Sequence, residues 1–472
     1  MSYELIVGLE THVELSTKTK IFCSCPTSFG DSPNSNCCPV CLGFPGALPR
    51  LNRAVVEYAV KAGLATDCKI GRVSKMDRKN YVYPDLPKAY QISQFDRPLC
   101  YDGGMDLSSG NRIRINRIHI EEDAGKLIHT AQGVCIDYNR GGTPLIEIVT
   151  EPDFRSIEEV REYVENLRLI MRYLDVSDCK MQEGSMRCDV NISVRRKGET
   201  RFGTRTELKN MNSISFICKA IEVEYQRQID EIEHGRPIVQ ETRRYVESGN
   251  YTESMRGKED SQDYRYFREP DLPLVNVSDA EVEALAAALP ELPRAKLNRY
   301  VDDFGINEKE ARQIVRYPAL AKYFEAMAEG VNPRQAANVM LTYVFRCFET
   351  DEQKEEGCVP VAAEELNRVL RYAAEGKLNQ NALKKVVDTM LKEGKGFDAI
   401  FTLEQFQAPE IDLSALCKGI VSDNPKIVSS YLGGAEKAIG ALIGQAMKAT
   451  KGAVDPAAIR AAILAAIEEV RA

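Results

Sequence analysis

The stretch Leu5-Ile-Val-Gly-Leu-Glu-Thr-His-Val-Glu-Leu15 predicts a β-strand with two unlike faces. Its odd positions are mostly apolar, whereas Glu10, His12 and Glu14 alternate with them. Because successive side chains of a strand point to opposite faces, the three polar groups share one face and the apolar residues share the other. His12 is therefore expected to have carboxylate neighbours.

Two later stretches repeat this pattern. In Arg187-Cys-Asp-Val-Asn-Ile-Ser-Val194, charged or polar residues alternate with apolar ones. In Thr204-Arg-Thr-Glu-Leu-Lys-Asn210, Glu207 shares a face with Lys209. Strands occur as neighbours rather than as repeated strand-helix-strand units, and the chain has no Rossmann or P-loop motif. We therefore predict an antiparallel α+β domain whose sheet has one apolar face and one charged face.

Further acidic residues are concentrated between His119 and Asp153. Carboxylates that converge from separate strands repel each other unless a cation holds them together. Any one of them could equally be a solvated surface residue in a salt bridge, and that alternative stays open for each residue alone. Taken together, they favour metal and phosphate chemistry. The acidic residues of this stretch are Glu121, Glu122, Asp123, Asp137, Glu147, Glu151 and Asp153.

Five of the fourteen cysteines lie in two short motifs, Cys23-Ser-Cys25 and Cys37-Cys-Pro-Val-Cys41. Cys-x-Cys followed by Cys-x-x-Cys is a tetrahedral thiolate set for zinc, and free thiols are the alternative. Four thiolates close the coordination sphere, so we predict a structural zinc knuckle over residues 23–41. Its expected ligands are Cys23, Cys25, Cys38 and Cys41, with Cys37 as a spare.

Length and composition bound the class of protein. A chain of 472 residues with 44% hydrophobic and 28% charged residues indicates two to four ordinary globular domains. No apolar run approaches the roughly 18 residues of a membrane span, and the N-terminus does not resemble a signal sequence, so we expect a cytoplasmic protein without a membrane partner. A net charge of -8 argues against a surface that binds nucleic acid all over, but permits a local basic patch.

Periodicity divides the chain into three expected domains. Residues 1–293 contain the strands and two amphipathic helices, one beginning at a capping box, Ser156-x-x-Glu159, and one at about 214–233. In residues 294–405 the 3.6-residue period dominates and predicts a helical domain.

Residues 406–472 predict a small, Ala-rich helical tail. Its lysines lie among glycines, an arrangement that lets a phosphate backbone approach closely, although a solvated helix face is the alternative. The lysines concerned are Lys437, Lys448 and Lys451.

Several longer motifs closely resemble the B-subunit family of the glutamyl/aspartyl-tRNA amidotransferases, and the resemblance runs the full length of the chain. Motifs of this length on separate segments rarely coincide by chance. They are Val7-Gly-Leu-Glu-Thr-His-Val-Glu-Leu15, Asp77-Arg-Lys-Asn-Tyr-Val-Tyr-Pro-Asp85, Pro87-Lys-Ala-Tyr-Gln-Ile-Ser-Gln-Phe95, His119-Ile-Glu-Glu-Asp-Ala-Gly-Lys126, Asn139-Arg-Gly-Gly-Thr-Pro-Leu-Ile-Glu-Ile148, Glu183-Gly-Ser-Met-Arg-Cys-Asp189 and Asp263-Tyr-Arg-Tyr-Phe267.

The resemblance implies a cradle domain like glutamine synthetase, then a helical domain and a tail that contacts tRNA. It also implies a ligase reaction in two stages. ATP phosphorylates the side-chain carboxylate of Glu-tRNA(Gln) or Asp-tRNA(Asn), and ammonia then displaces the phosphate. The implied partners are misacylated tRNA, an A subunit that releases ammonia from glutamine, and a small C subunit.

The family's site residues can be carried over to matching positions. The resemblance implies metal binding by His12, Glu122 and Glu147, with Glu10 and Glu207 close by, and this donor set suits Mg²⁺ or Mn²⁺. Contacts with the phosphates of ATP are expected from Arg187, Lys209, Arg256 and Arg265. Together with Glu122 and Glu147, the resemblance gives a catalytic role to Lys79 and Lys88, which lie with Tyr81 in motifs that it places near the ammonia entrance.

Two other classes of function compete with this interpretation. A non-catalytic zinc-containing RNA-binding protein would explain the cysteines and the tail but not the acidic residues, which repel RNA. A free-standing ligase that resembles glutamine synthetase would leave the helical parts without a role. The chain carries no recognisable glutaminase motif, so a partner that supplies ammonia is expected to be obligatory.

Overall fold

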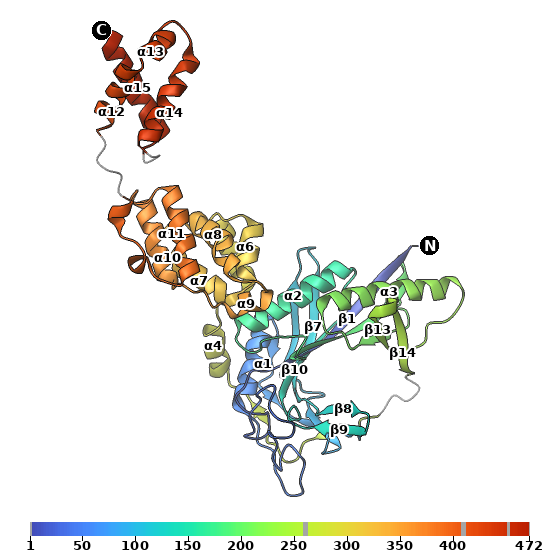
Figure 1. Ribbon diagram of the computed structural model, residues 1–472. Coiled ribbons are helices and arrows are strands. Elements are labelled where there is room, and N and C mark those ends of the chain that lie inside the picture. The colour runs from blue at the N-terminus through green and yellow to red at the C-terminus, as the bar shows by residue number, and fades with distance from the viewer. Residues whose placement is uncertain (1, 258–262, 407–411, 451–453, 472) are drawn as a thin grey trace. The chain divides into compact units, whose positions relative to one another are not determined.

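A large mixed sheet followed by helical regions makes up the computed structural model of the chain (Figure 1). The chain divides into two compact units, Met1–Lys296 and Leu297–Ala472. The structure describes residues 2–257, 263–406, 412–450 and 454–471.

Nine strands form the large sheet, in the order β14-β13-β12-β11-β1-β10-β7-β6-β2. Neighbouring strands are antiparallel, as predicted, except that β12 and β13 run parallel. A parallel pair needs a crossover connection, which the predicted helix α3 (Ile214–Glu233) supplies. The strands are β1 Tyr3–Glu14, β2 Lys69–Ile70, β6 Cys100–Asp106, β7 Arg112–Glu122, β10 Pro144–Thr150, β11 Met186–Arg196, β12 Thr206–Lys209, β13 Glu241–Val246 and β14 Tyr251–Gly257.

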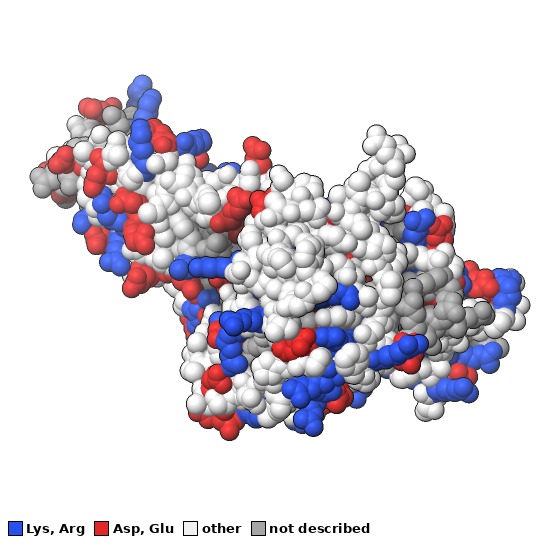
Figure 2. Space-filling view, turned by 90° about the horizontal axis from the view of Figure 1, so that it is seen from below, with Lys and Arg blue, Asp and Glu red and all other residues white. Residues whose placement is uncertain are grey.

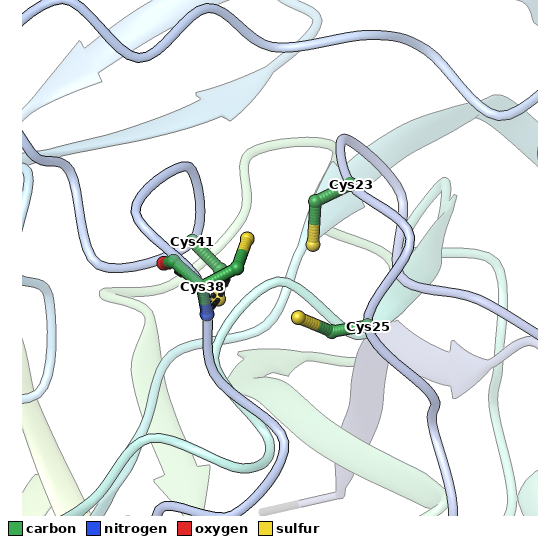
Figure 3. Close-up of side chains that lie close together, drawn as sticks. All are labelled: Cys23, Cys25, Cys38 and Cys41. Atoms are coloured by element: carbon green, nitrogen blue, oxygen red, sulfur yellow. Dashed lines mark hydrogen bonds between the residues drawn. The ribbon is translucent and has the colours of Figure 1, made fainter.

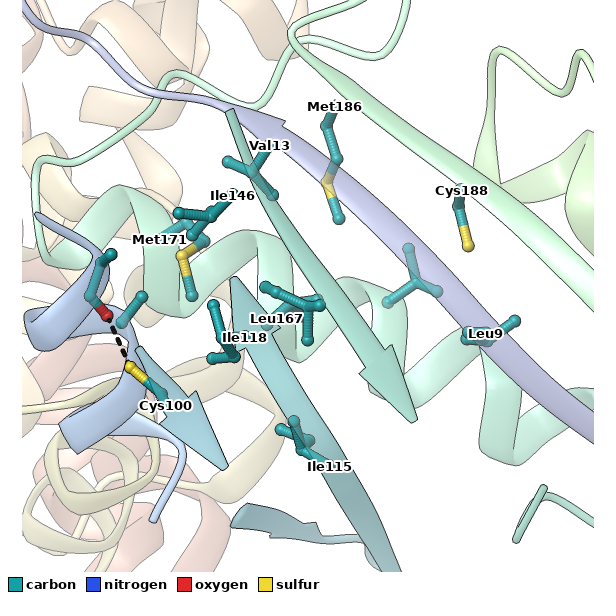
Figure 4. Close-up of a cluster of buried hydrophobic side chains, with 14 of the residues drawn as sticks. Leu9, Val13, Cys100, Ile115, Ile118, Ile146, Leu167, Met171, Met186 and Cys188 are labelled. Carbon is teal, nitrogen blue, oxygen red and sulfur yellow. Dashed lines mark hydrogen bonds between the residues drawn. The ribbon is translucent and has the colours of Figure 1, made fainter. Parts of the chain in front are cut away.

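One face of this sheet is apolar and covered by helices. Helices α2 (Ile157–Tyr173) and α3 lie along it in Figure 1, and Figure 4 shows Leu167 and Met171 of α2 beside Leu9, Val13 and Ile146 of the sheet. Burial of this apolar surface is the main stabilising contribution. The prediction that the apolar positions of β1 face the core is confirmed.

The predicted start of α2 is confirmed, but its capping box is only half formed. The Ser156 hydroxyl accepts a hydrogen bond from the Glu159 amide at 3.1 Å. The Glu159 carboxylate accepts from the Arg155 amide at 2.8 Å rather than from the amide of Ser156. The cap therefore satisfies one free amide of the first turn, and the carboxylate satisfies the amide of Arg155, the residue before the cap.

The same unit contains helix α1 (Arg53–Ala65), which was not predicted, and helix α4 (Asp279–Ala287), which begins at a capping box formed by Ser278 and Glu281. Helix α5 (Pro293–Asp302) follows α4. Three small sheets complete the unit, in the orders β15-β4-β5, β16-β3 and β8-β9. Their strands are β3 Val73–Ser74, β4 Asp77–Asn80, β5 Tyr90–Ser93, β8 Lys126–Thr130, β9 Gly133–Asp137, β15 Phe267–Arg268 and β16 Val275–Asn276.

The second unit is helical where the structure describes it. Helix α11 is capped at its C-terminal end by Gly394 in the left-handed conformation (φ 64°), which glycine adopts readily. The α-helices are α6 Glu308–Val315, α7 Pro318–Ala328, α8 Pro333–Thr342, α9 Asp351–Glu356, α10 Ala363–Ala374, α11 Gln380–Glu393, α12 Leu413–Asp423, α13 Pro425–Leu432, α14 Ile439–Ala449 and α15 Pro456–Arg471.

Short 3-10 helices interrupt both units. In the second unit, helices α12 to α15 enclose a hydrophobic cluster of their own, which includes Cys417, Leu442 and Ile463. Lys451 of the predicted tail surface lies outside the described residues. No helix among the described residues has the length and apolar character needed to cross a membrane. The 3-10 helices are η1 Glu247–Gly249, η3 Val344–Cys347, η4 Phe397–Ala399, η5 Leu403–Gln405 and η6 Glu436–Ala438.

Charged side chains of both signs are interspersed on the face of the molecule in Figure 2, which also shows broad areas without charge. The surplus of acidic residues is therefore not gathered into one patch on this face. Nor is this face a continuous basic surface of the kind that binds nucleic acid all over.

Candidate active site on the polar face of the sheet

The polar face of the large sheet brings together a group of ligand atoms that we call the histidine group: His12, Glu121 and Glu147. In the strand register, His12 of β1 lies opposite Glu147 of β10, which lies opposite His119 of β7. His12 Nε2 is 3.2 Å from Glu121 Oε1 and 3.5 Å from Glu147 Oε2. One ligand atom from each member of the group lies within 4.8 Å of the others.

His119 lies beside the same two carboxylates. Its Nε2 is 3.1 Å from Glu147 Oε2 and 3.7 Å from Glu121 Oε2. Its Nδ1 is buried and has no hydrogen-bond partner among the described residues. Two imidazoles therefore face two carboxylates, an arrangement in which protonated imidazoles balance the negative charge when no metal is bound.

The protonation of these groups follows from their mutual contacts. Burial alone would lower the pKa of His12, but hydrogen bonds and charges from Glu121 and Glu147 raise it to about 10. Burial would raise the pKa of Glu121, yet His119 and His12 lower it to about 2. A divalent cation that bound His12 would therefore have to displace a proton from it.

Glu122 does not belong to this group, which corrects the predicted set of His12, Glu122 and Glu147. Glu121 and Glu122 are consecutive in a strand, so their side chains point to opposite faces. The Glu122 carboxylate instead accepts hydrogen bonds from Lys88 Nζ at 2.6 Å and from the Ile92 amide at 2.8 Å. Glu121 takes the place predicted for Glu122 beside His12.

A second acidic group lies on the same face and contains Glu10, Asp189 and Glu207, from strands β1, β11 and β12. We call it the lysine group, because Lys209 Nζ lies 2.5 Å from Asp189 Oδ2 and 3.0 Å from Glu207 Oε1. Burial would lower the pKa of Lys209, but the charges of Asp189 and Glu207 raise it. The predicted neighbours Glu10 and Glu207 thus lie in a separate group, with Asp189 as a member that was not predicted.

Among the residues predicted to contact phosphate, Arg187 is the best placed. Its Nη2 donates to Asp123 Oδ2 at 2.6 Å, and Asp123 also faces Arg140 at 3.4 Å. Its Nε is buried without a hydrogen-bond partner in the part of the chain that the structure describes. Arg187 thus has one donor that an added anion could satisfy.

The other predicted phosphate contacts are less closely grouped. Lys209 already pairs with the lysine group. Arg256 of strand β14 pairs with Thr242 of β13, and the side chain of Arg256 is not described. Arg265 is exposed and has a left-handed backbone (φ 46°), and its carbonyl accepts a hydrogen bond from Asn80 Nδ2 at 2.9 Å.

The two predicted catalytic lysines lie in different surroundings. Lys79 Nζ lies 4.9 Å from the centre of the Tyr264 ring. Burial would lower the pKa of Lys79, but the negative charges of the histidine group, chiefly that of Glu121, raise it. Lys79 therefore interacts electrostatically with the histidine group. Lys88 pairs with Glu122 beside a cavity of about 90 Å³ that Cys23, Cys41 and Lys20 also line.

The four predicted zinc ligands converge. Figure 3 shows Cys23 and Cys25 facing Cys38 and Cys41 across a small gap, and the four sulfur atoms lie within 4.8 Å of one another. The Cys38 and Cys41 sulfur atoms are 3.9 Å apart, close to the roughly 3.8 Å separation that tetrahedral Zn–S bonds of about 2.3 Å require. The donor set fits zinc, and Cys37 lies outside it.

Comparisons with known proteins show the family of this chain. Residues 5–283 match the model of the GatB/GatE catalytic domain, and residues 322–467 match that of the GatB domain. The chain belongs to the GatB/GatE family. It is 47% identical over 481 residues to the B subunit of the aspartyl/glutamyl-tRNA(Asn/Gln) amidotransferase of Caldicellulosiruptor bescii, covering 100% of both chains. The proteins of the same name from Thermoanaerobacter pseudethanolicus and Clostridium botulinum are 48% and 44% identical, each alignment covering 97% of both chains.

The histidine group, the lysine group and the four cysteines all lie within the part matched to the GatB/GatE catalytic domain. Sequence reasoning missed Glu121, His119 and Asp189 as members of these groups. The sequence did contain a pattern that indicates His119 and Glu121. Ile118 and Ile120 face the core, so His119 and Glu121, which alternate with them, face the polar side of the sheet.

Proposed function

We propose that this chain is the B subunit of a glutamine-dependent tRNA amidotransferase. It binds Glu-tRNA(Gln), Asp-tRNA(Asn) or both, activates the side-chain carboxylate with ATP, and converts it to an amide with ammonia. The observation that carries this proposal is the 47% identity over 100% of both chains to a protein of that name. These comparisons do not favour the alternative of a non-catalytic zinc-containing RNA-binding protein.

The polar face is proposed to be the site of carboxylate activation. Bringing a carboxylate up to a triphosphate opposes like charges, and a bound Mg²⁺ or Mn²⁺ supplies charge that offsets this repulsion. The oxygen-rich donors of the histidine and lysine groups suit such ions. Support comes from the convergence of both groups on one face, where β1 contributes His12 to the first and Glu10 to the second.

Cationic side chains around these groups are proposed to hold the anionic substrates. Arg187 would direct its unpaired Nε–H toward a phosphate oxygen while Asp123 fixes the guanidinium. Lys209 would exchange a carboxylate for a phosphate oxygen, and Arg256 and Arg265 are kept as further phosphate contacts. Lys79 would orient the reacting carboxylate, because it lies in the field of Glu121.

The Lys88–Glu122 pair is proposed to serve ammonia delivery rather than metal binding. The two side chains are buried and lie away from the histidine group, beside the 90 Å³ cavity. Ammonia would come from an A subunit, which a C subunit would brace, because no glutaminase motif is recognisable in this sequence.

The remaining parts of the proposal concern architecture. We propose that the large sheet is a cradle like that of glutamine synthetase within residues 1–293, that residues 294–405 form a helical domain, and that residues 406–472 contact tRNA. Zinc at the four cysteines would tie down a segment with little core of its own. We propose the cytoplasm as the compartment.

Formation of ADP tests the proposal directly. The chain would be co-expressed with its A and C partners and given ATP, Mg²⁺, glutamine and either Glu-tRNA(Gln) or uncharged tRNA. ADP formed only with the misacylated tRNA is the expected result. ADP formed equally without aminoacyl-tRNA would indicate a small-molecule ligase, and no ADP with Glu-tRNA(Gln) or Asp-tRNA(Asn) would indicate a non-catalytic protein.

A further inference from the structure

Lys20 is a lysine whose whole side chain is buried beside the four cysteines. It is 0% exposed, and its Nζ has two neighbours, the Tyr138 carbonyl at 3.2 Å and Cys41 Sγ at 3.8 Å. Among the described residues, no carboxylate lies within ion-pairing distance of this ammonium. The carboxylate of Glu122, which lines the same cavity as Lys20, is bound by Lys88.

A buried ammonium needs an anion, because a carbonyl dipole alone does not replace the water that the charge loses. Four thiols would be neutral and would leave Lys20 without a counter-ion. Four thiolates around Zn²⁺ instead carry a net charge of about -2, and one of these thiolates is the neighbour of Lys20. A tetrathiolate centre therefore supplies, 3.8 Å from the Lys20 ammonium, the counter-ion that this buried side chain otherwise lacks.

We propose that Lys20 is a positioning residue of the zinc centre: its ammonium is the counter-cation of the tetrathiolate and joins it to the loop of residues 138–143. This inference rests on the proposed occupancy of the cysteines by zinc. It assigns to Lys20 a role that the cysteine spacing alone does not reveal.

The loop is fastened to the same corner by several contacts. Next to Lys20, the Ile21 amide donates to the Gly142 carbonyl at 3.0 Å, and the Asn36 amide donates to Asn139 Oδ1 at 2.8 Å. Gly142 has a positive φ of 84°, and a Cβ atom there would lie 3.5 Å from Lys20 Cδ and 3.6 Å from Cys41 Cβ. Both distances are ordinary van der Waals contacts, so the loop packs directly against the lysine and the cysteine, and it is the positive φ that favours glycine at this position.

The loop of residues 138–143 also contacts residues that lie next to the polar face of the sheet. Arg140 Nε donates to the Ala124 carbonyl at 3.0 Å and lies 3.4 Å from the Asp123 carboxylate. Asp123 in turn holds Arg187, the proposed phosphate contact, at 2.6 Å. Lys20 therefore connects the zinc centre to residues that fix the guanidinium of Arg187.

Two substitutions test the counter-cation. K20M keeps the length of the side chain but removes the charge, and K20R keeps the charge and has room beside the 90 Å³ cavity that Lys20 lines. In the full-length chain we expect K20M to bind zinc about 10-fold more weakly or worse in competition with a chelator, a typical effect of removing a partner of a metal ligand. K20R should restore most of that affinity. Equal zinc affinity in K20M and the unsubstituted chain would overturn the proposal.

A labelling experiment on the unsubstituted chain avoids the risk that a variant fails to fold. An amine-acylating reagent should leave Lys20 unmodified in the zinc-bound chain and should modify it once a chelator has removed zinc, as followed by peptide mass spectrometry. Lys296 is a matched control, because it is also buried but pairs with Glu291 at 3.0 Å, and it should stay unmodified in both states. Persistent protection of Lys20 after loss of zinc would contradict the proposal.

Metal analysis separates this inference from the proposed function. A chain purified without zinc, with Lys20 still protected, would overturn the zinc assignment and the counter-cation together. A zinc-bound chain that loses no zinc affinity in K20M would overturn the counter-cation alone and leave the ligase function standing. Faster hydrogen exchange of residues 138–143 in K20M than in K20R would support the link to the loop, and equal exchange would refute that link.

Discussion

The histidine group and the lysine group lie on the same face of one sheet, and strand β1 contributes His12 to the first and Glu10 to the second. They differ in the cations that balance their carboxylates. In the histidine group the balancing cations are imidazoles, which become neutral metal ligands when they lose a proton. In the lysine group the balancing cation is Lys209, which keeps its charge and can only move aside.

This difference indicates which of the two groups is better suited to bind a divalent cation. A proton that leaves His12 converts a competitor of the metal into a ligand. Lys209 has no corresponding state near neutral pH, because Asp189 and Glu207 raise its pKa against the effect of burial. We therefore expect the histidine group to dominate the metal dependence of the reaction and the lysine group to modulate it.

The largest expected effect is that of Glu121→Gln. It preserves the shape of the side chain but removes a charge and a ligand oxygen from the histidine group, so ADP formation at fixed Mg²⁺ should fall at least about 100-fold. The measurement is the rate of ADP formation with misacylated tRNA over a range of Mg²⁺ concentrations.

Glu122→Gln is the matched control, because it makes the same change at the next residue on the opposite face. It should lower stability by about 3 kcal/mol through loss of the buried partner of Lys88, while leaving the half-saturating Mg²⁺ concentration unchanged. If Glu122→Gln raised that concentration and Glu121→Gln did not, the corrected ligand assignment would be wrong.

The pH dependence of metal binding gives the next largest effect. His12 has a pKa raised to about 10, so it is protonated at neutral pH and the metal must displace the proton. Affinity for Mn²⁺ should therefore increase with pH, by about 10-fold per unit for each imidazole that must lose a proton, between about pH 7 and about pH 9. Titration of Mn²⁺ by calorimetry at several pH values measures this slope. An affinity for Mn²⁺ that does not change between these pH values would contradict the inference that metal binding to the histidine group displaces a proton.

The smallest expected effect is that of Asp189→Asn in the lysine group. The group is partly exposed and Lys209 already offsets part of its charge, so the half-saturating Mg²⁺ concentration should rise only about 3-fold to 10-fold. The same ADP assay measures it. If Asp189→Asn reduced ADP formation as much as Glu121→Gln does, both groups would contribute equally to metal binding, and the proposed difference between them would be wrong.

The alternation of β1 was sufficient to predict that Glu10, His12 and Glu14 share a face, because the period of a strand depends only on local geometry. It was not sufficient to distinguish Glu121 from Glu122. Strand β7 has a register shift against β10 between Val149 and Thr150, and its core positions change from Ile113 and Ile115 to Ile118 and Ile120. Such an irregularity reverses which residues face the core.

The convergence of the four cysteines was predicted because their spacing is local, and helix α3 was predicted from its amphipathic period. The parallel pairing of β12 with β13 and the grouping of Asp189 with Glu10 depend on which strands become neighbours. That choice is set by packing of segments far apart in the chain, which periodicity does not report.

The central place of β1 in the sheet has a consequence for synthesis of the chain. Its partners are Leu145–Val149 in β10 and Met186–Arg196 in β11, so β1 leaves the ribosome well before either strand with which it pairs. Pairing across such sequence separations is slow, because loop closure must precede the contacts that stabilise it. Until then an apolar strand is exposed, and the nascent chain is vulnerable to aggregation through this segment. The polar face of the sheet is accordingly among the last parts of its unit to form.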